Sequence, residues 1–147
     1  IIRLRLRDFN FMKESVQAIL ISTEGEFILQ KRDNKPGIGV PGKVVNFGGS
    51  SELGETPFQA IARETYEELC IKLSEDDFKL FGSFVMKSSL DGEDRLRYVF
   101  IARNIKKADL ILKEGEAIVF AKTKEDLEKF PLSEGTKIAL DLFYKNG

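Results

Sequence analysis

Three glutamates at helical spacing are the residues of this chain best suited to chemistry. Glu64, Glu67 and Glu68 stand at positions i, i+3 and i+4, so a helix would place them on one face. Carboxylates about 6 Å apart repel each other by roughly 3 kcal/mol at an effective dielectric near 20. No lysine lies among them, and Arg63 is the cation that the same stretch offers. The cluster predicts a bound divalent cation, with a solvated helix face as the alternative interpretation.

Composition narrows the chemistry further. The 147 residues include no histidine and one cysteine, Cys70, which excludes catalysis by histidine, zinc held by histidine and an internal disulfide. Carboxylates are then the strong metal ligands, and they select hard cations such as Mg²⁺ or Mn²⁺. A net charge of −1 argues against nonspecific binding to nucleic acid.

The length fits one domain spanning residues 1–147. No apolar run approaches the roughly 18 residues of a membrane span, and no signal-peptide pattern opens the chain. We therefore expect a cytoplasmic protein with no membrane partner.

The glutamates are expected on a helix that begins at Thr56 and Pro57, a residue pair typical of a helix start. Its apolar positions recur at helical spacing and predict packing on a sheet; they are Phe58, Ile61, Ala62, Thr65 and Leu69. Strands are expected at 2–7, 15–22, 26–32, 44–47, 78–87, 95–105 and 117–121, with turns at Gly48-Gly49 and Asp91-Gly92, a loop over 33–43, and helices over 123–129 and from 133. This order of elements predicts a mixed sheet with helices on both faces.

The segment 49–71 resembles the Nudix box, G-x5-E-x7-R-E-U-x-E-E-x-G-U, where U is a bulky apolar residue. The matching residues are Gly49, Glu55, Arg63, Glu64, Glu67, Glu68 and Ile71. Six fixed residues match by chance in about one window in 10⁷ at ordinary residue frequencies. Thr65 replaces an aliphatic residue, and Cys70 replaces the glycine that ends the helix, which puts the geometry of that end in doubt.

The resemblance extends over residues 15–72 through the lead-in Leu29–Arg32, the pair Gly48-Gly49, and Glu52. It implies the α/β (α+β) fold of the Nudix family, a Nudix-type α/β/α sandwich with a mixed sheet between helices. Phe47 stands where the family often has proline, and we expect it to pack in the core rather than stack on a base.

The resemblance also implies a mechanism. The box of Nudix enzymes binds divalent cations that bridge a diphosphate and activate a water molecule. Carried over, the ligands would be the Gly48 carbonyl, Glu64, Glu67 and Glu68, with Glu55 anchoring the box or holding a metal through water, and Arg63 orienting a glutamate. The general base would be Glu64, or Glu114 or Glu116 from a later loop, for which an ordinary acidic turn is the alternative.

The substrate is less defined by the sequence. Arg32 is the favoured phosphate contact outside the box, with an ordinary surface arginine as the alternative, and Glu116 is a second candidate for substrate contact. Arg95 and Arg97 could reach substrate, but a solvated strand edge is the favoured interpretation. We expect an Mg²⁺- or Mn²⁺-dependent pyrophosphohydrolase acting on a nucleoside diphosphate linked to another group, a nucleotide sugar or a nucleoside triphosphate.

Two other functions remain open. One is a catalytically silent Nudix-fold module that binds nucleotides or regulates, which the retained glutamates argue against. The other is a Nudix-fold isomerase of isopentenyl diphosphate, which needs histidine ligands that this chain lacks. The apolar stripe Ile2, Leu4 and Leu6 predicts a homodimer that depends on residues 1–7, with packing inside the domain as the alternative.

Overall fold

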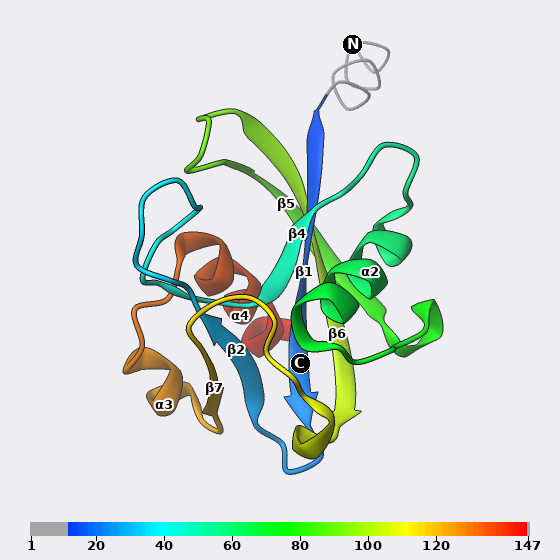
Figure 1. Ribbon diagram of the computed structural model, residues 1–147, viewed down its shortest axis with the longest axis vertical. Helices are drawn as coiled ribbons and strands as arrows, with labels where there is room; N and C mark the ends of the chain where they lie inside the picture. Colours follow the sequence, from blue (N-terminus) through cyan, green and yellow to red (C-terminus); the bar gives the residue numbers. More distant parts are fainter. Residues whose placement is uncertain (1–11, 147) are drawn as a thin grey trace.

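Residues 12–146, the part of the chain that this computed structural model describes, pack around one mixed β-sheet with helices on both faces (Figure 1). The central strand is β1 (Lys13–Ser22), in which alternate residues face opposite sides of the sheet. The strand predicted at 2–7, and the homodimer contact expected from it, lie outside the described residues and stay predictions.

The sheet forks on one side of β1. Along its other side β1 runs parallel to β6 (Asp94–Ile105), which pairs in turn with β5 (Lys79–Lys87). On the forked side, the first half of β1 pairs antiparallel with β4 (Phe47–Ser50) and its last residues with β2 (Phe27–Lys31). β2 also pairs with β3 (Val44–Val45) and β7 (Ala117–Ala121). Strands β2 and β4 therefore diverge from a common partner.

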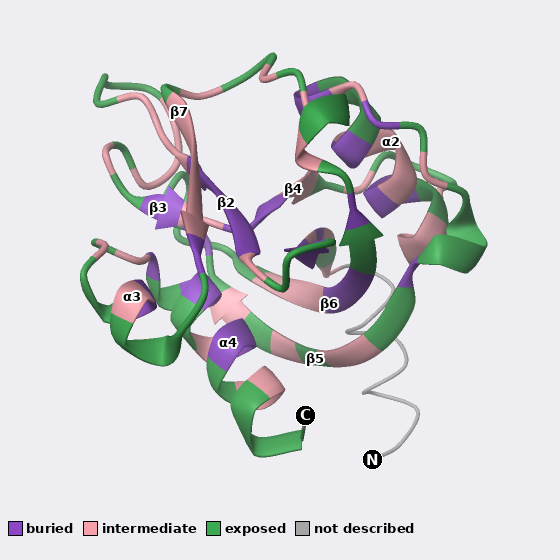
Figure 2. Ribbon diagram, turned by 90° about the horizontal axis from the view of Figure 1, so that it is seen from below, coloured by how far each residue is buried: buried purple, intermediate pink, exposed green. Residues whose placement is uncertain are grey.

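Two apolar layers hold the helices against this sheet. Helix α2 (Pro57–Leu69) buries Ala60, Ile61 and Leu69 against one face, where Phe47 and Phe100 are fully enclosed. Helices α3 (Lys124–Glu128) and α4 (Glu134–Asn146) cover the other face with Leu127, Ala139 and Leu140. Two short helical turns complete the fold: η1 (Glu75–Asp77) precedes β5, and η2 (Lys107–Asp109) follows β6. Figure 2 shows buried segments in the strands and in the helices on either side of them. The two layers confirm the predicted α/β/α sandwich.

The predicted turn at Gly48-Gly49 is wrong. Both glycines belong to β4, where Gly48 is opposite Gln17 and Gly49 is opposite Val16. A Cβ at Gly48 would lie 2.0 Å from the carbonyl oxygen of Val16. The glycines are therefore needed for close approach of two strands rather than for reversing the chain. Phe47, just before them, is fully buried, which confirms the expected core packing.

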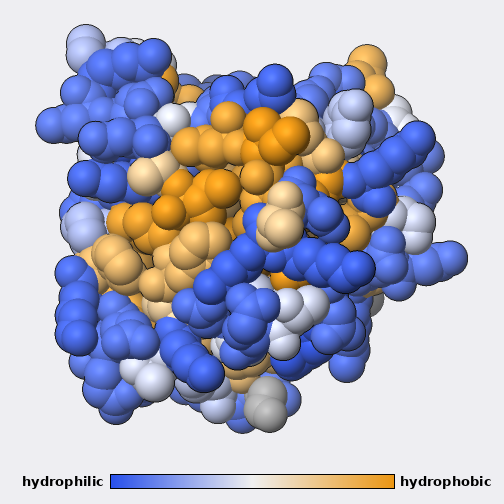
Figure 3. Space-filling view, turned by 60° about the horizontal axis from the view of Figure 1, so that its bottom comes forward, coloured by the Kyte–Doolittle hydropathy of each residue, from blue (hydrophilic) through white to orange (hydrophobic). Residues whose placement is uncertain are grey.

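Some apolar side chains remain at the surface. Figure 3 shows a group of them across the middle of the face that it draws, with hydrophilic residues around it. Ile111, which precedes β7, is 57% exposed. Among the helices within 12–146, none combines the length and the apolar character that crossing a membrane would require.

Candidate active site

Helix α2 carries the glutamates, and local sequence defines both of its ends. The hydroxyl of Thr56 accepts from the backbone N–H of Gln59 at 3.1 Å, and the Gln59 side chain accepts from the N–H of Thr56 at 2.9 Å. This reciprocal capping box confirms the predicted start. At the other end Cys70 adopts the left-handed conformation usually taken by glycine, with φ of 58°, and its N–H donates to Tyr66. The helix thus ends in the normal way without the glycine.

The three glutamates differ in burial. Glu68 is 2% exposed, and its Oε1 accepts a hydrogen bond from the backbone N–H of Gly48 at 2.9 Å. Glu64 lies over Gly49, where an added Cβ would be 2.6 Å from its carboxylate. Glu67 points outward, with 52% of its side chain exposed. The helix therefore directs two carboxylates onto the glycine strand β4 and one toward solvent.

Arg63 neutralises much of the acidic cluster. Its guanidinium donates to Glu55 at 2.7 and 2.9 Å and to Glu64 at 3.0 Å, and it reaches Glu67 at 3.3 Å. A longer ion pair of 3.8 Å joins it to Glu52, and Nη2 also donates to the Ser50 carbonyl. These carboxylates hold the pKa of Arg63 above its usual value, the hydrogen bond to Glu55 being the largest cause. Arg63, the cation that the sequence offers in this stretch, thus compensates the charge of this part of the cluster.

Glu68 is the carboxylate left without such a partner. Its pKa is raised to about 9, chiefly by burial, with the negative charges of Glu64 and Glu114 acting in the same direction. The Gly48 N–H and the more distant Arg32 oppose this shift. Burial likewise raises the pKa of Glu64, against the pull of Arg63. A cation placed beside Glu68 would stabilise its ionised form, which the protein alone does not.

The donor chemistry of the site fits a hard divalent cation. Glu64 and Glu68 supply carboxylate oxygens beside Gly48 and Gly49, and the missing side chain at Gly49 lets the Glu64 carboxylate lie close to the backbone. Over residues 12–146, however, no three acidic side chains stand grouped as ligands of one ion. Arg63 lies between Glu64 and Glu67 instead. Binding of a cation therefore requires rearrangement of these side chains.

A second acidic element faces the same place. The loop 110–116 is fastened to the end of α2 by two backbone hydrogen bonds, from Ile111 to Leu69 and from Lys113 to Glu68. Its Glu114 is exposed, and its charge raises the pKa of both Glu64 and Glu68. Glu116 lies beyond it, where it pairs with Lys31 at 3.6 Å.

A cavity of about 600 Å³ opens beside these residues. It lies on the side of the sheet where β2 and β4 diverge, and Gly48 and Gly49 form part of its wall. Loop 33–43, the β5–β6 hairpin and the start of α4 complete it. Arg32 lines the cavity and donates from Nε to the Gly39 carbonyl at 3.2 Å. Glu116 does not line it.

The comparisons with known proteins agree with this geometry. The model of the NUDIX domain matches residues 12–142. This chain belongs to the Nudix family. The hydrolases of this family act on pyrophosphate bonds, and the chain is an enzyme of that class.

Solved Nudix structures share the fold over nearly the whole chain. The MutT protein from Methanosarcina mazei Go1 is 20% identical, with a TM-score of 0.76 over 92% of this chain and 95% of its own. The MutT NUDIX hydrolase from Burkholderia pseudomallei is 26% identical, with a TM-score of 0.68 over 88% of this chain and 96% of its own. A bifunctional NMN adenylyltransferase/ADP ribose pyrophosphatase from Francisella tularensis, complexed with AMP and a Mn ion, is 21% identical, with a TM-score of 0.69 over 99% of this chain and 45% of its own.

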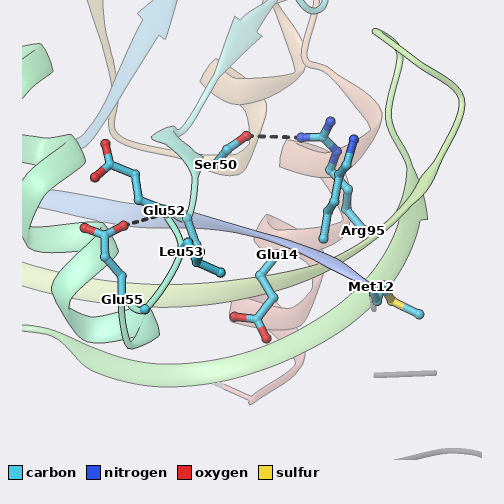
Figure 4. A pocket seen from close by; sticks show the side chains of 10 residues that line it. Met12, Glu14, Ser50, Glu52, Leu53, Glu55 and Arg95 are labelled. Carbon is cyan, nitrogen blue, oxygen red and sulfur yellow. Dashed lines mark hydrogen bonds between the residues drawn. The ribbon is translucent and has the colours of Figure 1, made fainter. Parts of the chain in front are cut away.

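Two arginines of β6 lie along the cavity rather than along a solvated strand edge. Arg95 and Arg97 both line the cavity, and only 13% of the Arg95 side chain is exposed. Figure 4 shows Arg95 reaching Ser50, whose hydroxyl accepts from it at 3.1 Å, beside a second pocket formed with the 51–55 loop. The favoured interpretation of these two arginines is wrong because the β5–β6 hairpin lines the cavity together with loop 33–43 and the start of α4.

Two polar groups of the site were missed by the sequence interpretation. Gln30, 1% exposed, donates from Nε2 to the Glu114 carbonyl at 2.7 Å and lies 3.5 Å from Arg32. Asn46, 7% exposed, donates to Oε1 of Gln17 at 2.7 Å in the cavity floor. Each interrupts an apolar strand sequence, FILQK and VVNF, and that interruption was the available signal.

Proposed function

We propose that this Nudix hydrolase is a divalent-metal-dependent pyrophosphohydrolase whose substrate is a nucleoside diphosphate linked to another group, either a nucleoside triphosphate or a nucleotide sugar. The observation that carries this proposal is the placement of buried Glu68 on Gly48, at the wall of a cavity of about 600 Å³. A volume of this size accommodates a nucleotide-sized ligand beside the carboxylates.

The residues of the Nudix box and of the cavity have different roles in this proposal. Glu64, Glu67, Glu68 and the Gly48 carbonyl would hold Mg²⁺ or Mn²⁺, which supplies charge neutralisation at the diphosphate and a more acidic bound water. Glu55 holds the Arg63 guanidinium in a two-pronged ion pair, so that Arg63 keeps Glu64 oriented over Gly49. Arg32, on the cavity wall, contacts a phosphate oxygen.

The proton of the attacking water needs a carboxylate acceptor. Glu64 is one candidate, although Arg63 already engages it at 3.0 Å. Glu114 is the better placed of the two loop candidates, because its charge acts on Glu64 and Glu68 whereas Glu116 pairs with Lys31. The water oxygen forms the new bond to phosphorus, the bridging P–O bond breaks, and the leaving phosphate takes the electron pair.

Two structural neighbours support the substrate class. The Francisella tularensis structure contains AMP and a Mn ion, and its protein is described as an ADP ribose pyrophosphatase. An E. coli neighbour with 17% identity is described as a dihydroneopterin triphosphate pyrophosphohydrolase. Both act at a diphosphate within a larger molecule, as proposed for this chain.

The test is a panel of nucleoside triphosphates and nucleotide sugars incubated with Mg²⁺ or Mn²⁺. Release of nucleoside monophosphate should be found for at least one of them, and it should disappear in excess EDTA and in Glu68→Gln. A folded protein that binds nucleotides but releases no product would support the silent binding module instead. Turnover unaffected by EDTA would contradict the metal requirement.

A further inference from the structure

The cavity beside the Nudix box combines apolar walls with a polar floor. Its walls include Val40, Val45, Met86 and Leu90, which suit a flat ring. An added Cβ at Gly39 would lie 3.7 Å from both Ser89 and Leu90, so loop 33–43 and the β5–β6 hairpin meet over the cavity. A ring held here would lie with its edge against polar groups of β1, β6 and the start of α4.

Arg97 is one of two arginines of this cavity that have no acidic partner among the described residues; the other, Arg32, donates to the Gly39 carbonyl. Within residues 12–146 no carboxylate lies within 4.0 Å of the Arg97 guanidinium, although Glu134 lines the same cavity. Its Nη2 makes one long hydrogen bond, 3.3 Å, to the Lys87 carbonyl, and its Nε is buried without an acceptor. Burial and the charge of Arg95 lower its pKa. Arg97 therefore carries donors that the described part of the protein leaves unused.

The neighbouring Arg95 shows the contrast. Its two terminal nitrogens donate to Asp91 at 2.9 Å and to the hydroxyl of Ser50 at 3.1 Å, although its Nε, like that of Arg97, is buried without an acceptor. Figure 4 shows the bond to Ser50. Arg97, two residues along the same strand, lies instead against the start of α4. A methyl group added at Gly135 would be 3.3 Å from its Nη1. The absence of a side chain at Gly135 lets the guanidinium lie this close to the helix backbone, where both residues line the cavity.

A group that binds in the cavity beside Arg97 must supply acceptors, because a guanidinium has five N–H donors and accepts no hydrogen bond. Two adjacent acceptors in one plane match its fork best. The edge of a keto purine offers this pair as O6 and N7, whereas adenine presents an amino donor in place of O6. A donor facing Arg97 would leave both groups unpaired, and unpaired groups in a site built for hydrogen bonding give strong discrimination.

We propose that Arg97 selects the base of the substrate, so that nucleotides with two adjacent acceptors on the base edge, as in guanine, are preferred over adenine nucleotides. This inference rests on the proposed function, since it assumes that the diphosphate lies at the Nudix box and the base in the cavity. The floor contributes the amide pair of Gln17 and Asn46, whose remaining donors and acceptors meet the rest of the base.

The experiment compares the wild type with Arg97→Met, Arg97→Lys and Arg103→Met. Arg103 is a matched control on the same strand, where it is exposed and lies over the Phe143 ring outside the cavity. For each protein, kcat/KM is measured with GTP and ATP, and the affinities for GMP and AMP are measured by calorimetry. Circular dichroism melting verifies that each variant is folded.

The wild type and Arg103→Met should prefer guanine nucleotides by at least about tenfold. Arg97→Met should reduce this preference to within about threefold, chiefly by weakening GTP and GMP. Arg97→Lys should lose most of the preference too, because lysine keeps the charge but lacks the planar fork. Equal use of GTP and ATP by the wild type would overturn the inference, as would an equal loss for both nucleotides in Arg97→Met.

Two further outcomes separate the inference from the proposed function. If Arg97→Lys kept the full preference, Arg97 would act as a point charge and the selection by paired acceptors would be wrong. If no triphosphate were cleaved with Mg²⁺ or Mn²⁺, triphosphate cleavage would be excluded, while the affinities for GMP and AMP would still decide the role of Arg97.

Discussion

The buried carboxylate of Glu68 accepts a hydrogen bond of 2.9 Å from the backbone N–H of Gly48, which joins helix α2 to strand β4. This bond places a group with a pKa of about 9 beside a glycine of the Nudix box. The Nudix box thus contains a buried carboxylate whose negative charge is not neutralised by an ion pair within the described residues. Its consequences for metal binding, catalysis and stability can be measured separately.

Glu68→Gln should lower kcat by at least about 100-fold, because the amide keeps the hydrogen bond from Gly48 but is a poor metal ligand. Glu64→Gln should lower kcat by a similar factor, because Glu64 is a proposed metal ligand or general base. Glu52→Gln is the control. Glu52 is exposed, and its ion pair with Arg63 is long, at 3.8 Å, so this substitution should change kcat far less. Near-normal kcat in folded Glu68→Gln would show that the ligand assignment is wrong.

Glu68 should also make the metal-free protein sensitive to pH. Its pKa in the folded state lies above the ordinary value of 4.5, so its protonated form is favoured by folding. That contribution is complete below about pH 4.5 and is lost as pH rises toward about 9. In EDTA, the Tm of the wild type should therefore fall relative to Glu68→Gln between pH 5 and 9. A constant difference in Tm over this range would contradict the assigned shift.

Mg²⁺ should reverse this loss. A cation that binds the folded state raises Tm in proportion to the logarithm of its concentration above Kd. We expect millimolar Mg²⁺ or Mn²⁺ to stabilise the wild type at pH 8 and to stabilise Glu68→Gln much less. Equal stabilisation of both proteins, measured by differential scanning fluorimetry, would place the cation elsewhere.

The two glycines of β4 should respond differently to alanine. At Gly48 a Cβ would meet the Val16 backbone at 2.0 Å, which cannot move without separating the strands, so Gly48→Ala should unfold or strongly destabilise the protein. At Gly49 the Cβ would meet the mobile end of Glu64 at 2.6 Å. Gly49→Ala should therefore fold, with a Tm close to the wild type, and lose kcat at least about tenfold through displaced Glu64. Folding and activity assays on both variants distinguish the two effects.

Gln30 should act on catalysis through the loop that carries Glu114. Gln30→Leu removes the hydrogen bond to the Glu114 carbonyl and should cost about 1–3 kcal/mol of stability. If Glu114 is the base, kcat should fall in this variant, and Glu114→Gln should remove the acidic limb of the pH–rate profile. Lys31→Met, which affects the Glu116 ion pair instead, serves as control. An unchanged pH profile in Glu114→Gln would leave Glu64 as the base.

The sequence by itself determined the elements whose signals are local. Thr56 and Pro57 start α2 because capping and a fixed φ need only the next few residues, and the structure confirms this start. The hairpin around Asp91-Gly92 likewise follows from turn chemistry, and β7 follows from a short apolar run. The box residues were recognisable because their spacing along one helix carries the resemblance.

Only the tertiary structure decided how far those residues are buried and which charges surround them. Glu67 and Glu68 are neighbours in the chain, yet one is half exposed and the other is buried on Gly48, 20 residues away. Gly48-Gly49 form a strand because β1 passes close behind them. Arg97 lies in a cavity because the start of α4, nearly 40 residues later, faces it at Gly135. Burial and charge compensation depend on such distant partners, and spacing along the chain does not specify them.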